Sequence, residues 1–155
     1  MSKLTTWLWF DKEAEEAMNF YCSVFRNSKK GAVSRYPAAM GGGVMTTEFE
    51  IEGYKICGLN GGPQFKHSEA FSIMIDCKDQ AEVDHYWNAL TADGGAESMC
   101  GWLKDRLGIS WQVIPRRLME LQMDPDKAKA GRAMQAMLKM RKIIVADLEA
   151  AAAAG

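Results

Sequence analysis

The sequence predicts an α+β protein in which two paired βαβββ modules form a curved mixed sheet around a cleft, with helices at the C-terminus. A strand followed by a helix occurs twice, and the two helix segments are AEEAMNFY, residues 14–21, and QAEVDHYW, residues 80–87. Both segments follow an apolar strand, keep a Glu near the helix start and finish on two aromatic side chains. Because strand patterns follow each copy, we infer an internal repeat of one supersecondary unit.

These patterns divide one domain, residues 1–155, into three parts. The first module covers residues 1–62, the second covers residues 66–116, and a helical extension covers residues 117–155. The length suits one domain of about 100 to 200 residues. With 48% hydrophobic and 25% charged residues, the composition is that of a folded globular protein.

The first module should begin with a strand and a helix. Residues 5–10, TTWLWF, are rich in side chains that favour strands, and Asp11 can cap the helix that follows. That helix is expected over residues 13–25, where apolar side chains recur at steps of three and four: Ala14, Ala17, Met18, Tyr21 and Phe25. One face of the helix should therefore pack on the sheet.

Three more strands should complete this module. The candidates are residues 32–36, 44–51 and 54–59, and the last two form a hairpin that turns at Glu52-Gly53. Gly61-Gly62 ends the last strand, and the pair lets the backbone approach either a ligand or a neighbouring strand closely.

The second module should repeat this order. Residues 71–77 form a strand, and Asp79 and Glu82 have the spacing of a capping box at the start of a helix. Four large side chains share one face of this helix: Val83, Tyr86, Trp87 and Leu90.

A β-hairpin closes the second module and carries the most informative polar residue. The strands, residues 99–103 and 110–114, flank the turn at residues 105–108, in which Gly108 can take a positive φ. Alternation along the second strand gives Gln112 apolar neighbours on its face. A buried amide is costly without a hydrogen bond, so Gln112 should have a partner in the protein, in water or in a ligand.

The C-terminal part should be helical. Residues 118–123 form a short helix, and Asp124-Pro125 begins another. The second helix has an apolar stripe: Ala130, Met134, Met137 and Leu138. Methionine at this spacing usually fills a core, because its flexible thioether adapts to irregular gaps.

Charge and hydropathy exclude several classes of partner. The formal net charge of −1 gives no long-range attraction to nucleic acid. No apolar run approaches the roughly 18 residues that a membrane span needs, and the N-terminus lacks the features of a signal peptide. We therefore expect a cytoplasmic protein that binds neither nucleic acid nor membrane.

Cysteine and histidine patterns do not indicate a metal site. Four cysteines are widely separated, without a CxxC pair: Cys22, Cys57, Cys77 and Cys100. In a reducing compartment such residues act as small core hydrophobes. Neither His67 nor His85 has a partner at the spacing of metal ligands.

The sequence identifies no catalytic residue. Gly41-Gly42-Gly43 precedes a strand, whereas a nucleotide-like cofactor is bound by a glycine-rich turn from a strand into a helix. Ser68, Ser72 and Ser110 have no base at a recognisable spacing, so nucleophilic catalysis also lacks support.

Three segments carry a family resemblance: WFDKEAEEAMNFY at residues 9–21, LNGGPQF at residues 59–65 and CGWLKDRLGISWQVIP at residues 100–115. Together they resemble the PhnB-like family, also labelled 3-demethylubiquinone 3-methyltransferase-type domains, of the vicinal-oxygen-chelate superfamily. The resemblance covers nearly the whole chain, including the C-terminal helices, and implies paired βαβββ modules. The superfamily contains glyoxalases, extradiol dioxygenases, fosfomycin-modifying enzymes and metal-free bleomycin-binding proteins, so the fold alone does not give the activity.

The resemblance also implies where metal ligands would lie. Metal-using relatives place His, Glu or Gln on the first, fourth, fifth and eighth strands. The eighth-strand position falls on Gln112, and the fifth falls near Ser68, with His67 one residue out of register. The first-strand position, residues 4–6, has no strong ligand, and Asn60 closes the fourth strand. Since an amide is a weak ligand, we expect neither a metal nor another cofactor.

We therefore expect a metal-free small-molecule-binding protein or enzyme of this superfamily. Its aromatic-lined cleft would use four ligand-binding residues: Trp9, Asn60, Trp102 and Gln112. Whether it catalyses a reaction stays open. One alternative is a metal-dependent lyase, isomerase or dioxygenase-type enzyme acting on vicinal oxygens, with Gln112 as a ligand. Another is a scaffold whose C-terminal helices bind a partner.

The expected partners are an unidentified small molecule and a second copy of the chain. Sheet edges need cover, and the stripe of Met134, Met137 and Leu138 is more apolar than a free helix tolerates. Symmetric dimers are the commonest oligomers, so we predict a homodimer. Docking of the stripe within one chain would cover it equally well.

Overall fold

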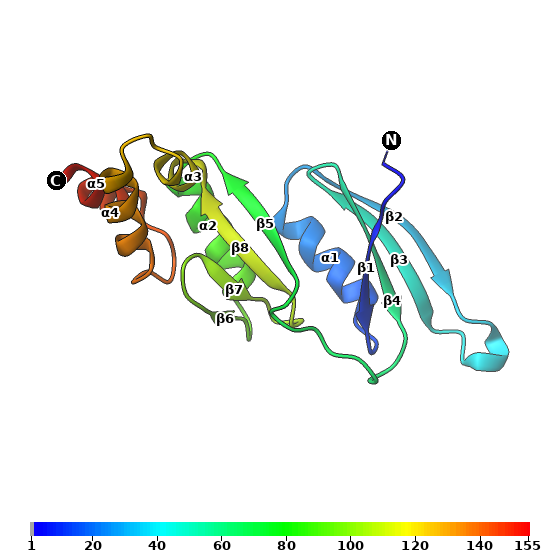
Figure 1. The fold of residues 1–155 in the computed structure, drawn as a ribbon. Coiled ribbons are helices and arrows are strands. Elements are labelled where there is room, and N and C mark those ends of the chain that lie inside the picture. The colour runs from blue at the N-terminus through cyan, green and yellow to red at the C-terminus, as the bar shows by residue number, and fades with distance from the viewer. Residues whose placement is uncertain (1) are drawn as a thin grey trace. The chain divides into compact units, whose positions relative to one another are not determined.

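The computed structural model describes residues 2–155, which form two compact units (Figure 1). The first unit ends at His67, and the second is Ser68–Gly155. Each unit contains a four-stranded mixed sheet built in the order strand, helix and three strands. The α+β class and the two βαβββ modules are thereby confirmed. Within residues 2–155, no helix has the length and apolar character that crossing a membrane requires.

The first unit contains five main elements: β1 (Thr6–Phe10), α1 (Ala14–Val24), β2 (Ser28–Arg35), β3 (Val44–Ile51) and β4 (Tyr54–Asn60). The strand order is β1-β4-β3-β2, in which β1 runs parallel to β4 and the other pairs are antiparallel. A single turn of 3-10 helix, η1 (Ala38–Met40), interrupts the connection between β2 and β3.

Helix α1 packs closely on the sheet because small residues face one another. A Cβ added to Gly58 would lie 3.1 Å from the Cβ of Ala14. The buried Thr47 hydroxyl donates to the carbonyl of Ala14 over 3.1 Å. These contacts hold the first turn of α1 against β3 and β4.

The second unit repeats the topology with β5 (Ser72–Cys77), α2 (Gln80–Thr91), β6 (Ala96–Glu97), β7 (Trp102–Lys104) and β8 (Ser110–Pro115). Its strand order, β5-β8-β7-β6, matches that of the first sheet, and β5 runs parallel to β8.

The predicted cap and buried face of α2 are both present. Asp79 accepts a hydrogen bond from the amide of Glu82 over 3.0 Å, and the Glu82 carboxylate accepts one from the amide of Lys78 over 2.8 Å. The four predicted core residues are the buried ones: Val83, Tyr86, Trp87 and Leu90.

Three helices continue the second unit: α3 (Arg116–Gln122), α4 (Lys127–Met137) and α5 (Val145–Ala153). Their apolar cluster includes the side chain of Ile114 from β8. The amides of Cys100 and Gly101 donate to the carbonyls of Met140 and Arg141 over 2.7 and 2.8 Å. The helical extension therefore packs within the second unit.

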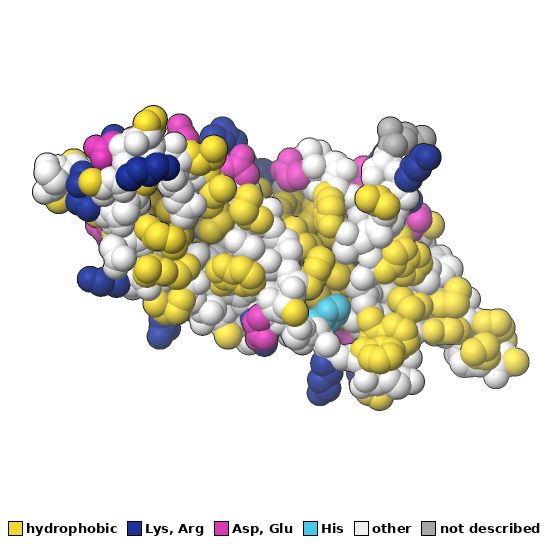
Figure 2. Space-filling model, viewed as in Figure 1, with side chains coloured by type: hydrophobic (Ala, Val, Ile, Leu, Met, Phe, Trp, Pro, Cys, Tyr) yellow, Lys and Arg dark blue, Asp and Glu magenta, His cyan; other side chains and the backbone are white. Residues whose placement is uncertain are grey.

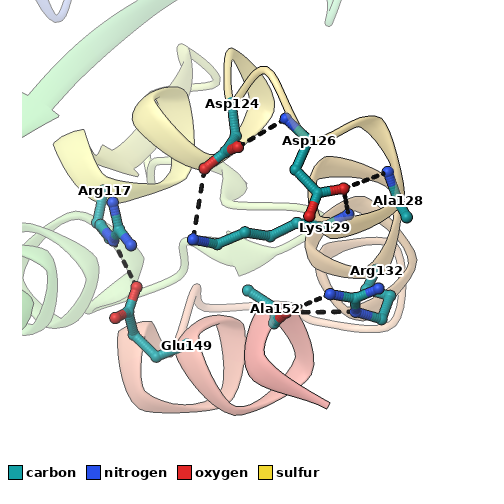
Figure 3. A network of polar contacts seen from close by, with 8 residues as sticks. All are labelled: Arg117, Asp124, Asp126, Ala128, Lys129, Arg132, Glu149 and Ala152. Atoms are coloured by element: carbon teal, nitrogen blue, oxygen red, sulfur yellow. Dashed lines mark hydrogen bonds and ion pairs between the residues drawn. The ribbon is translucent and has the colours of Figure 1, made fainter. Parts of the chain in front are cut away.

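A polar network joins the three helices (Figure 3). Arg117 pairs with Glu149, and Lys129 pairs with Asp124. Asp126, rather than Asp124, caps α4, because its carboxylate accepts from the amides of the first turn. Asp124 instead accepts from the amide of Asp126 over 2.9 Å, which orients the capping residue.

Candidate functional site

Gln112 and Trp102 are cross-strand partners in the second sheet. Gln112 pairs with Trp102 of β7 on one side and with Met74 of β5 on the other. Paired residues point to the same face of a sheet, so the three side chains form one row. We call Met74, Gln112 and Trp102 the Gln112 row. Met74 is 47% exposed, and the other two are half-buried.

The Gln112 amide has a partner inside the protein, as expected. Its Nε2 donates to the Oγ of Ser72 over 2.9 Å. Ser72 belongs to the neighbouring row, in which Ser110 pairs with Ser72 on β5 and with Lys104 on β7. A row of two hydroxyls therefore lies beside the Gln112 row.

The charges on this face of the sheet are paired. Lys104 forms an ion pair with Glu69, and its hydrogen bond to that carboxylate lowers the pKa of Glu69. On the other side of the Gln112 row, Asp76 pairs with Arg116 over 2.9 Å and raises the pKa of that guanidinium. The side chains between these two ion pairs carry an indole, a thioether, an amide and two hydroxyls, of which that of Ser110 is buried.

Asp105 anchors the hairpin that presents Gln112, whereas the sequence predicts only that it lies in the turn. Asp105 is 2% exposed. It accepts from the amides of Leu107 and Ile109 over 2.8 and 3.1 Å, and from Nε1 of Trp111 over 2.9 Å. An Asp that begins a tight turn often bonds the backbone two residues on, which is the signal that could have found it. The turn also has the predicted positive φ at Gly108, 90°.

Trp9 is covered by the chain segment that follows β4. Its Nε1 donates to the carbonyl of Gly62 over 2.9 Å, and the ring of Phe65 stacks edge-on at 4.9 Å. A Cβ added to Gly61 would lie 2.3 Å from the indole. His67 Nε2 lies 2.6 Å from the carbonyl oxygen of Trp9. The close approach that the glycine pair permits is therefore made to a tryptophan of the same unit.

Asn60 caps α1, a role that the sequence assigned to Asp11. Its Oδ1 accepts from the amide of Ala14 over 2.8 Å, and its Nδ2 donates to the carbonyl of Val44 over 3.1 Å. Asp11 could not be distinguished from the true cap by sequence, because Asn60 reaches the helix from the end of β4.

The predicted site residues are brought together only in part. Trp102 and Gln112 share a row and a face in the second unit. In the first unit, Trp9 pairs with Leu59, whereas Asn60 pairs with Phe10. Since successive residues alternate across a strand, Trp9 and Asn60 point to opposite faces of their sheet.

Two of the donors that the resemblance implied for a metal have hydrogen-bond partners within their own unit. Within the described chain, residues 2–155, no three His, Cys, Asp or Glu side chains lie close enough together to hold an ion. His67 Nε2 is engaged with a backbone carbonyl, and the Gln112 amide with a serine hydroxyl.

Two of the cysteines are buried, as predicted for core residues. Burial raises the pKa of the Cys57 thiol, and it raises the pKa of the Cys77 thiol to about 12. Such thiols stay protonated at neutral pH and are poor nucleophiles. Cys22 and Cys100 are half-buried, so the expectation holds less well for them.

Comparison with known proteins gives a family match. The model of the 3-demethylubiquinone-9 3-methyltransferase family matches residues 2–114. A PhnB protein from Bacillus cereus is 32% identical with a TM-score of 0.68, and the match covers 74% of this chain and 99% of that chain. No curated protein matches.

Two further structures show the fold alone, because their identity is low. PA1353 from Pseudomonas aeruginosa is 20% identical with a TM-score of 0.62, covering 74% of this chain and 98% of that one. The fosfomycin resistance protein FosX from Listeria monocytogenes is 18% identical with a TM-score of 0.56, covering 79% and 97%.

The family match does not include the C-terminal helices. It ends at residue 114, whereas α3 begins at Arg116. The expectation that the resemblance extends over these helices is therefore wrong. Helices of this kind are generic in sequence, and their apolar stripe does not distinguish one family from another.

Proposed function

This chain belongs to the 3-demethylubiquinone-9 3-methyltransferase family, and from that premise we propose that it binds a small organic molecule without a metal ion. The fold is that of the vicinal-oxygen-chelate superfamily, whose members are small-molecule-binding proteins or enzymes. The ligand surface that we propose is the Gln112 row. Trp102 and Gln112 are its ligand-binding residues.

The observation that carries this proposal is the composition of the row. An indole and a thioether flank an amide on one face of the sheet. The residues on either side of Gln112 in β8, Trp111 and Val113, point to the opposite face and are buried. Aromatic and sulfur-containing side chains supply contact area, and a few polar groups orient a ligand. Trp9 and Asn60 make contacts inside the first unit, so we place the ligand on the second unit.

The metal-free part of the proposal rests on the donor set. A catalytic zinc centre needs about three protein ligands, and Gln112 is one amide among hydroxyls and apolar groups. Elemental analysis of protein purified without added metal should find no stoichiometric transition metal. Stoichiometric zinc, nickel, iron or manganese that is lost in Gln112→Ala would support the metalloenzyme alternative instead.

The proposal does not include methyl transfer. Gly41, Gly42 and Gly43 lead from η1 into β3, as the sequence predicted, rather than from a strand into a helix. A nucleotide-like methyl donor is usually held where glycine-rich backbone meets a helix N-terminus. The description of the family therefore supports membership of that family, whereas the function of this chain has to be inferred from the residues of its own site.

Ligand screening by thermal shift tests the proposal directly. A compound that binds only the native state raises the melting temperature. We expect small aromatic amides or phenols to stabilise the wild type, and Trp102→Ala or Gln112→Ala to remove the shift. The exposed Gln135→Ala is the matched control and should keep it. A shift that persists in both site variants would place the ligand elsewhere.

A further inference from the structure

Ser110 has an unusual environment for a hydroxyl. The residue is 2% exposed, and its Oγ is the one buried side-chain oxygen or nitrogen in residues 2–155 without a hydrogen-bond partner. Nearly all buried polar groups in native proteins are bonded, because an unpaired one loses its hydration without compensation. This hydroxyl therefore requires an explanation.

The position of Ser110 supplies one. It lies two residues before Gln112 on β8, so the two side chains share a face. Ser72 is its partner on β5, and the Oγ of Ser72 already accepts from the Gln112 amide. The unpaired hydroxyl thus lies on the same face of β8 as the Gln112 amide.

We propose that Ser110 is a ligand-binding residue of the Gln112 row and that the ligand is a planar aromatic molecule carrying a hydroxyl or carboxamide group. This inference rests on the function proposed above. The ring lies along Trp102 and Met74, and the polar group donates to Gln112 Oε1. Because the Ser110 hydroxyl is buried in the free protein, the ligand displaces the side chains that cover it and then bonds it. Hydroxyl and carboxamide groups can both donate and accept, which satisfies both atoms.

The neighbouring charges select a neutral group. Lys104 is the cross-strand partner of Ser110, and its ammonium is paired with Glu69. An anionic ligand would have to displace that carboxylate from the cation. Asp76, on the far side of the row, is likewise paired with Arg116. The charged side chains that the register of the described strands places beside the row, Lys104 and Asp76, are thus both held in ion pairs.

The first test needs no ligand. Ser110→Ala removes a hydroxyl that has no partner, so we expect the melting temperature of the free protein to rise by about 2 to 6 °C. Ser72→Ala is the matched control, because it removes a hydroxyl that is bonded, and it should lower the melting temperature. If Ser110→Ala destabilises the protein as much as Ser72→Ala does, the hydroxyl has a partner within the fold and the inference fails.

The second test uses three ring-matched probes, which are phenol, benzamide and benzoate, in titration calorimetry. We expect a neutral probe to bind the wild type at least about 10-fold more tightly than benzoate. Ser110→Ala should weaken that binding about fivefold, the effect of one net hydrogen bond. Equal binding of benzoate would overturn the ligand class.

The outcomes also separate this inference from the function on which it rests. If Trp102→Ala abolishes binding of a neutral probe while Ser110→Ala leaves the affinity unchanged, the Gln112 row binds ligand and the role of Ser110 is wrong. If no probe binds the wild type, the ligand class is wrong, and the broader thermal-shift screen decides whether the row binds any small molecule.

Discussion

At the scale of single residues, one buried carboxylate positions the hairpin of the site. Asp105 gathers three N–H donors from a turn and from Trp111, so both of its oxygens act as acceptors. In Asp105→Asn, an NH2 group replaces one oxygen and faces a donor. We expect the free energy of unfolding in urea to fall by about 1 to 3 kcal/mol. The exposed Asp93→Asn is the control and should stay within about 0.5 kcal/mol of wild type.

Cys77 should make stability depend on alkaline pH. Burial, and then the nearby carboxylates of Glu82 and Asp76, raise the pKa of its thiol from 9.0 to about 12. The folded state therefore holds this proton when the unfolded state has lost it. The contribution to stability is complete below pH 9 and decreases as the pH rises from 9 towards 12. Unfolding free energies at several pH values should show a shallower alkaline decline in Cys77→Ala, and parallel declines would contradict the assignment.

The sequence predicted the roles of single residues correctly where the deciding contact is between near neighbours in the chain, or where it follows from the alternation of side chains along a strand. The side of the strand on which Gln112 lies and the turn at Gly108 can both be predicted from residues that are neighbours in the sequence. Asn60 shows the limit, because its amide bonds Ala14 and Val44, which are distant in the sequence. Ser110 shows another limit, since an unpaired hydroxyl becomes visible only when every neighbour is placed.

At the scale of elements, strands with clean alternation had the right bounds, and β3 matches its predicted range, residues 44–51. Strand β2 begins at Ser28, four residues before the predicted start. Its early part, Ser28 to Lys30, is polar and pairs with the end of β3. Pairing across the sheet there overrides the weak strand propensity of the sequence.

The extension depends on a contact that the sequence could not reveal. Gln80 Nε2 donates to the carbonyl of Ile143 over 3.0 Å, and Gln80 Oε1 accepts from the amide of Val145 over 2.7 Å. One side chain thus bonds the backbone on both sides of Ile144, the residue that precedes α5. This pair of bonds fixes the chain between α4 and α5 to the start of α2.

Gln80→Ala should therefore loosen the extension selectively. Two backbone groups would lose their partners, and we expect a loss of about 1 to 3 kcal/mol in unfolding free energy. Hydrogen exchange should accelerate at residues 140–148 more than in β5 or β8. The exposed Gln135→Ala provides the comparison, with unchanged exchange in that segment. Uniform acceleration across the second unit would mean that Gln80 supports the sheet rather than the extension.

At the scale of the whole molecule, the repeated module was predictable and the function was not. The two sheets have the same strand order, which the repeat of strand and helix patterns predicted. Substrate choice depends on the side chains of a few strand positions, which differ among proteins of one fold. Membership of the family therefore supports a small-molecule-binding protein or enzyme, and the Gln112 row is the surface on which we propose that the ligand binds.

The surface of α3 and α4 bears on the oligomeric state. Hydrophobic side chains reach the surface over the C-terminal helices (Figure 2). Met123 is 81% exposed, and Met134 and Leu138 are each 48% exposed. Met137 packs against the buried cluster of the extension, so docking within the chain covers only part of the predicted stripe. Met134 and Leu138 lie four residues apart, one helical turn along the chain, and two exposed apolar side chains at that spacing favour association with another surface of the same kind.

We therefore predict a homodimer in which a second copy covers Met134 and Leu138. Light scattering should give twice the chain mass of 17.2 kDa. Replacing both residues by Glu should shift the mass to that of a monomer, because an unpaired carboxylate is costly to bury in an interface. Met40→Glu, on the exposed η1 of the first unit, should leave the dimer intact. A monomer mass for the wild type across a broad concentration range would reject the dimer and leave these side chains exposed to solvent.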